Sequence, residues 1–124
     1  MTGSMDAAER EATLGAAIDL FDAGRYLAAH ELFEELWEST EGPESDFFKG
    51  LLQAAVALHH LEGGNLEGAA RLHSGHRRFL AGYQPVHAGI EVTRFLAEMQ
   101  AFLRPALEAQ ASPPSAERPR LRSR

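Results

Sequence analysis

The chain has no cysteine among its 124 residues. Disulfide bonds and thiolate zinc sites are therefore excluded, and a metal site would need histidine and carboxylate ligands. Long apolar runs are missing as well, because the longest with at most one polar interruption, LLQAAVAL, is far shorter than the roughly 20 residues of a membrane-spanning helix. The first residues, MTGSMDAAEREAT, are polar and acidic, unlike a signal peptide. We therefore expect a cytoplasmic protein with no membrane segment.

Basic residues are scarce in the first part of the chain. Residues 1–46 contain twelve acidic and two basic residues, whereas residues 111–124 contain one acidic and four basic residues. The formal net charge of the whole chain is −6. An acidic surface repels nucleic acid and anionic lipid, so we do not expect a polyanionic partner except at the arginine-containing end, where binding would be strongly salt-dependent.

β-Branched residues are few and alanine is abundant, which favours an all-α fold. Apolar periodicity, broken by glycine and turn residues, predicts five helices. Their approximate ranges are 6–23, 26–39, 44–62, 66–80 and 90–109, with a loop, AGYQPVHAG, before the last. Pro105 lies inside the fifth helix and predicts a kink or fraying there. We expect residues 1–110 to form one helical domain and residues 111–124 to form a disordered Pro/Arg-rich tail, because the tail has only one large apolar residue.

Two stretches of the chain repeat one pattern at an offset of 40 residues. FDAGRYLAAHELF (21–33) and LEGGNLEGAARLH (61–73) each contain a helix end, a glycine, a polar residue and a new helix with alanine at its fourth position. Gly24 corresponds to Gly64, and Ala29 to Ala69. This pattern resembles the helix pairs of tetratricopeptide proteins, although two degenerate copies are fewer than usual. It predicts a compact array of antiparallel helices.

The segment AHELFEELW (29–37) contains the first candidate polar site. On a helix, His30 and Glu34 are four residues apart and lie side by side at the edge of an apolar face that includes Trp37, while Glu31 points toward solvent. Two interpretations remain open. His30 and Glu34 could bind a ligand or act as an acid/base pair. A half-buried histidine bonded to a carboxylate could instead fix the helix register.

The third helix supplies the other candidate residues. Lys49 and Gln53 share one stripe with His60, whereas His59 lies on a stripe with apolar residues. We expect one of these two histidines to point inward and the other to be more exposed. The Lys49 stripe predicts either a polar groove or an ordinary solvent edge. The candidate site as a whole consists of His30, Glu31, Glu34, Trp37, Lys49, Gln53 and His59.

His73 and His76 lie on the apolar stripe of the fourth helix. Two histidines three residues apart can chelate a metal, but such a pair is weak evidence for one. We interpret them as core histidines that bond to backbone or carboxylate groups. The sequence thus predicts no metal or cofactor and assigns no catalytic residue.

Four motifs, taken together, resemble a known family. These are AGRYLAAHELFEELW, FFKGLLQAAVALHH, GNLEGAARL and, less closely, YQPVHAGIEV, and they span about residues 18–96. In order and spacing they are similar to the domain-of-unknown-function family 309, small helical proteins of bacteria and archaea. The motif positions include His30, Glu31, Glu34, Trp37, Gly50, His59, Asn65, Gly68 and Ala69. The resemblance implies a compact all-helical fold and implies no particular activity.

Two functional hypotheses follow from these patterns. The first is a small binding module that uses a groove between the second and third helices to bind another protein or a second copy of itself. The alternative is a metal-dependent enzyme or small-ligand binder centred on His30, Glu34 and His59. They differ in whether these three side chains converge on an open pocket.

Overall fold

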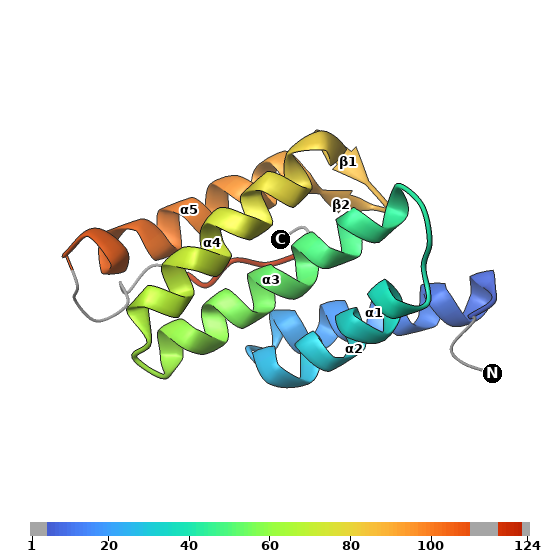
Figure 1. Cartoon of the computed structure of the whole chain (residues 1–124), viewed down its shortest axis with the longest axis horizontal. Helices are drawn as coiled ribbons and strands as arrows, with labels where there is room; N and C mark the ends of the chain where they lie inside the picture. Colours follow the sequence, from blue (N-terminus) through green and yellow to red (C-terminus); the bar gives the residue numbers. More distant parts are fainter. Residues whose placement is uncertain (1–4, 110–116, 123–124) are drawn as a thin grey trace.

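The computed structural model describes residues 5–109 and 117–122, and most of these residues are helical. The five helices are α1 (Ala7–Asp22), α2 (Tyr26–Glu38), α3 (Glu44–Glu62), α4 (Leu66–Leu80) and α5 (Val92–Ala109) (Figure 1). A short 3-10 helix, η1 (Ala81–Tyr83), and two strands, β1 (Val86–His87) and β2 (Ile90–Glu91), connect α4 to α5. The predicted all-α class is confirmed, and the first four helices lie within two residues of their predicted bounds.

Helix starts follow the capping chemistry of the sequence. Asp6 accepts a hydrogen bond from the backbone N–H of Glu9, whose side chain accepts one from Asp6 in return, so α1 begins with a capping box. The side chain of Asn65 accepts the N–H of Gly68 at 2.9 Å and caps α4. Asn65 is therefore the N-cap of α4.

The two similar stretches form the same turn. Gly24 and Gly64 have φ angles of +80° and +79°, a region that glycine occupies without steric penalty. The N–H of Arg25 bonds to the carbonyl of Leu20, and the N–H of Asn65 bonds to that of His60. These backbone bonds close the preceding helix. The shared glycine-plus-polar pattern therefore predicted a shared backbone geometry.

Helix α3 is the central element of the fold. It packs against α2 on one side and α4 on the other, while α1 packs against α2 and α5 against α4 (Figure 1). Phenylalanine rings fill the interior, and the rings of Phe21 in α1 and Phe95 in α5 meet edge-on with centroids 5.6 Å apart. Gly50 allows close packing of α3 on α4, because a Cβ there would lie 2.6 Å from Cγ of Leu80.

The segment before α5 differs from the prediction. In place of a loop followed by a helix from residue 90, β1 and β2 form a two-stranded antiparallel hairpin, and α5 begins at Val92. Ala88 and Gly89 have φ angles of +51° and +77°, as a two-residue hairpin turn requires. Alanine rarely adopts this geometry, so the sequence carried only half of the usual turn signal. Pro105 lies inside α5, which continues to Ala109.

The C-terminal segment also differs from the prediction where the structure describes it. Residues 117–122 lie against α1 and α5, and Leu121 is only 1% exposed. Predicted disorder is therefore wrong for these six residues, because Leu121 enters the core and the flanking polar groups find partners. Residues 111–116 and 123–124, for which disorder was also predicted, lie outside the described residues. Across the described part of the chain, none of the helices has the length and apolar character to cross a membrane.

Candidate functional site

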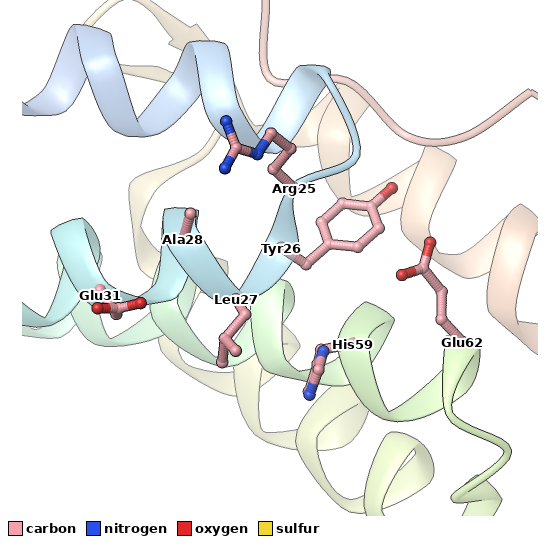
Figure 2. A pocket seen from close by; sticks show the side chains of 7 residues that line it. All are labelled: Arg25, Tyr26, Leu27, Ala28, Glu31, His59 and Glu62. Atoms are coloured by element: carbon pink, nitrogen blue, oxygen red, sulfur yellow. The ribbon is translucent and has the colours of Figure 1, made fainter.

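A hollow of about 420 Å³ lies between the first turns of α2 and the last turns of α3 (Figure 2). These turns are neighbours because α2 and α3 are antiparallel and pack together. The residues around the hollow are Arg25, Tyr26, Leu27, Ala28, Glu31, His59 and Glu62. The hollow therefore lies between the two helices that the sequence marked out, at the end where α2 begins.

Most of the lining is exposed, and it combines the apolar side chains of Leu27 and Ala28 with several ionisable ones. Leu27 is 52% exposed and is one of the two large apolar side chains exposed among the described residues, the other being Val86 on the hairpin. Glu31 and Glu62 are exposed as well, while Tyr26 is buried. Figure 2 shows the Tyr26 ring extending toward Glu62, with Glu31 at the opposite end of the hollow. The hollow is thus an open surface with an apolar patch and a charged border, in which Glu31 and Glu62 outnumber Arg25.

Arg118, from the C-terminal segment, reaches the end of the hollow at which Tyr26 and Glu62 lie. Its Nη1 is 3.9 Å from Oε2 of Glu62, and its guanidinium packs against Gly24 so closely that a Cβ there would lie 2.0 Å from Nη1. Burial raises the pKa of the Tyr26 hydroxyl, and the positive charge of Arg118 partly opposes that effect. The C-terminal segment therefore contributes to the electrostatics of this end of the hollow.

Of the seven predicted site residues, Glu31 and His59 line the hollow. His59 is exposed and His60 is half-buried, so of the two histidines the one on the apolar stripe is the more exposed. The physical reason is position along the helix. The stripe of His59 is covered by neighbouring elements at Phe48 and Leu52, but at the last turn of α3 the same side of the helix opens toward the hollow.

Glu34 and Trp37 behave differently from each other. Glu34 is exposed, against the expectation of partial burial, because a carboxylate at the edge of the apolar face extends into water unless a partner compensates its desolvation. Trp37 is half-buried, and its ring lies 4.2 Å from Nζ of Lys49. This cation–π contact joins two predicted site residues through packing of α2 on α3.

His30 and Gln53 each carry a buried polar atom. Within the described residues, Nδ1 of His30 and Oε1 of Gln53 have no hydrogen-bond partner. Oε1 of Gln53 lies against α4, where a Cβ on Gly75 would be 2.1 Å away. A buried group without a partner costs about 1–3 kcal/mol. These two atoms are therefore the polar groups of the predicted set that a water or small ligand would stabilise most.

The two core histidines are buried as predicted, but their partners differ from the prediction. Nδ1 of His73 lies 3.0 Å from Nε2 of His76, and Nε2 of His73 lies 3.0 Å from Oε1 of Gln100 on α5. Burial lowers the pKa of both rings, and burial together with the charges of His73 and Arg77 lowers that of His76 to about 3. Both histidines are thus neutral and join α4 to α5.

A second polar cluster involves the hairpin, and sequence reasoning missed it. Nε2 of His87 lies 2.8 Å from both carboxylate oxygens of Glu44, the first residue of α3. The His87 ring also packs edge-on against Phe47 and Tyr83. The signal was weak because 43 residues separate His87 from Glu44. This cluster anchors the hairpin to the start of α3.

The donor groups are dispersed over the molecule. Among residues 5–109 and 117–122, histidines and carboxylates form no group of three that could hold a metal ion. The hollow brings together groups suited to contact, namely one exposed leucine and ionisable side chains around it. Its arrangement can bind an apolar side chain and pair with charges beside it.

The fold is that of a small all-α domain built on antiparallel helix pairs. Helices α1 and α2, and likewise α3 and α4, are joined by a turn in which a glycine has a positive φ angle. Residues 14–72 match the family model described as Domain of unknown function (DUF309). The match covers α2, α3 and the seven residues that line the hollow. It confirms the family resemblance that the motifs predict. A comparison with curated proteins finds no match.

Proposed function

We propose that this protein is a helical interaction domain that binds a partner protein, or a second copy of itself, through the hollow between α2 and α3. The observation that supports this proposal is the exposure of Leu27, at 52%, among charged residues. Protein interfaces commonly combine an apolar centre with a polar rim, and a few central side chains supply most of the binding energy. Leu27 is the residue of the hollow best suited to that role.

The charge around the hollow defines the kind of partner. Glu31 and Glu62 line it, and Glu34, Glu35 and Glu38 extend the exposed acidic surface along α2. A partner that presents an apolar side chain flanked by lysine or arginine would complement this surface. Such rim charges mainly raise the association rate, and salt weakens their effect.

A metal-dependent enzyme or small-ligand binder centred on His30, Glu34 and His59 is the second candidate. The observation in its favour is the buried Nδ1 of His30, which has no partner in the described part of the chain. Elemental analysis of the purified protein tests the metal version. If the protein carries no stoichiometric metal and His30→Ala changes only stability, the metal version of this candidate is wrong.

The interaction proposal is tested with two matched variants. Leu27→Glu places a charge in the hollow, and Val86→Glu places the same charge on the hairpin, where Val86 is also exposed. Light scattering after size exclusion measures self-association, and quantitative affinity capture measures partner binding. We expect Leu27→Glu to reduce association at least tenfold and Val86→Glu to leave it unchanged. A strict monomer whose captured proteins do not depend on Leu27 would contradict the proposal.

A further inference from the structure

The six described residues of the C-terminal segment are held by charged side chains of two helices. Asp19 and Asp22 lie near the end of α1, and Arg94 and Glu98 lie in the first two turns of α5. We call these four residues the α1–α5 surface. We propose that the α1–α5 surface is a binding site for short Arg-Leu-Arg peptides, and that residues 120–122 are its tethered ligand. None of these four residues lines the hollow proposed to bind a partner, although Arg118 of the same segment reaches one end of that hollow.

The α1–α5 surface binds the main chain of three consecutive residues. Arg94 donates from Nη1 to the carbonyl of Arg120 at 3.0 Å and from Nη2 to the carbonyl of Leu121 at 3.1 Å. Glu98 accepts the N–H of Arg120 at 3.0 Å. Asp22 accepts the N–H of Leu121 at 2.7 Å through Oδ1 and the N–H of Arg122 at 3.1 Å through Oδ2. Each bond includes a charged group, and such bonds are roughly twice as strong as neutral ones.

The side chains of the segment add sequence specificity. Leu121 is 1% exposed and belongs to the hydrophobic core, so an apolar residue is required at the central position. Nε of Arg122 donates to Oδ1 of Asp19 at 3.0 Å, and Nη2 of Arg120 lies 3.8 Å from Oδ2 of Asp22. A basic residue is therefore favoured on both sides of the leucine.

The α1–α5 surface is built for this contact. The side chain of Asp22 is only 8% exposed, and burying a carboxylate to that extent is costly unless hydrogen bonds compensate it. Its compensation comes from the two N–H groups of the segment. Arg94 is oriented by Glu91 at 3.0 Å and by Glu98 at 2.7 Å, which aims its remaining donors at the peptide carbonyls. Any peptide that supplies the same groups would satisfy the same buried charges.

The ligand in this structure is tethered to the site. Seven residues separate the end of α5 at Ala109 from Glu117. A short tether gives a local ligand concentration on the order of millimolar, so the segment competes strongly with any free peptide. A partner's Arg-Leu-Arg peptide therefore gains access mainly when the chain's own segment is displaced or weakened.

The test uses a fluorescent peptide with the sequence of residues 117–122, ERPRLR, and two full-length variants. Arg122→Glu replaces an exposed side chain with one that Asp19 and Asp22 repel, so it weakens the tethered ligand without altering the core. Arg104→Glu is the matched control, since Arg104 is exposed and bonds to Glu108 on the same helix. We expect Arg122→Glu to bind the peptide at least tenfold more tightly than wild type, and Arg104→Glu to behave as wild type.

A second peptide and a second variant make the test specific. The peptide ERPRDR, with aspartate in place of the leucine, should bind none of the proteins. Adding Arg94→Met to Arg122→Glu removes both carbonyl contacts and should abolish binding of ERPRLR. Equal binding of ERPRLR to wild type and Arg122→Glu, or equal binding of the two peptides, would overturn the proposal. Amide exchange in the wild type gives an independent readout, because rapid exchange at Leu121 and Arg122 would also overturn it.

Discussion

His73 and His76 share a hydrogen bond of 3.0 Å between Nδ1 of the first ring and Nε2 of the second, and both rings are buried between α4 and α5. Because the Gln100 oxygen accepts from Nε2 of His73, Nδ1 of His73 is the acceptor and His76 donates. Both rings are neutral in this arrangement. A proton added to either ring would place a charge inside the core.

This pair predicts that the protein loses stability as the pH falls below about 6.5. The folded-state pKa of each ring lies below the ordinary histidine value, that of His76 at about 3. Above pH 6.5 the two histidines are neutral in both the folded and the unfolded protein, so they do not change the free energy of unfolding with pH. Below it the unfolded chain takes up protons that the folded chain excludes. The free energy of unfolding therefore falls by up to roughly 1.4 kcal/mol per pH unit through His76, and His73 adds a further loss in the same direction. Urea unfolding from pH 7.5 to pH 5 measures this slope.

Two variants assign the slope to the buried pair. His76→Phe keeps an aromatic ring beside Phe95 and removes the more strongly shifted of the two buried titrating rings, so it should reduce the pH dependence. His59→Gln removes an exposed histidine and should leave the slope unchanged. If both variants keep the wild-type slope, the buried pair is not its source.

Two glycines in helices should respond to alanine in opposite directions. A Cβ at Gly50 would lie 2.6 Å from Cγ of the fully buried Leu80, so Gly50→Ala should destabilise the protein by about 1–3 kcal/mol. No described atom lies within 4 Å of a Cβ at Gly15 in α1, so Gly15→Ala should stabilise it by about 0.5–1 kcal/mol. Thermal and urea unfolding of both variants measure the difference. A loss of stability in Gly15→Ala would contradict the helix-propensity argument.

Much of the fold could be predicted because its signals are local. Apolar periodicity defines each helix, and glycine or a capping residue marks where it ends or begins, as Asn65 does for α4. The similarity around Gly24 and Gly64 predicted the same turn twice, and the backbone bonds agree. The hairpin escaped prediction because Ala88, with a positive φ angle, gives no residue-type signal.

The candidate site was harder to predict because helical phase does not tell how far a neighbouring element extends. His59 has the phase of a core residue, yet the last turn of α3 faces an open hollow. Glu34 has the phase of a partly buried residue, yet its carboxylate remains in water. Glu31, assigned to the solvent side, does line the hollow. Helical phase showed on which side of the helix each residue lies. The packing of neighbouring elements decided which part of that side is buried.

The C-terminal segment shows how a charge signal can be present and still be misassigned. The acidic first part of the chain and the basic end are complementary, and the structure joins them through pairs such as Asp19 with Arg122. Composition alone favoured disorder because only one large apolar residue is present. That residue, Leu121, is the one that enters the core.

The contact between Trp37 and Lys49 should be measurable on its own. Nζ of Lys49 lies 4.2 Å from the ring centroid, and partly exposed pairs of this kind contribute about 0.5–1 kcal/mol. We expect Lys49→Met to lower the free energy of unfolding by that amount and to shift the fluorescence of the single tryptophan. Lys49→Arg keeps the charge over the ring and serves as the control. If methionine and arginine give the same stability, the cation is not responsible.

The shared turn allows a helix cap to be moved from one helix to the other. Asn65 caps α4 with φ −88° and ψ 81°, and Arg25 occupies the corresponding position before α2 with φ −92° and ψ 72° but makes no side-chain cap bond. Arg25→Asn should therefore let the new side chain accept the N–H of Ala28 and raise the free energy of unfolding by about 1 kcal/mol, while Asn65→Ala should lower it by a similar amount. Urea unfolding measures both, with Arg25→Ala separating loss of the arginine from gain of the cap. An Arg25→Asn variant no more stable than Arg25→Ala would show that the two turns are not interchangeable.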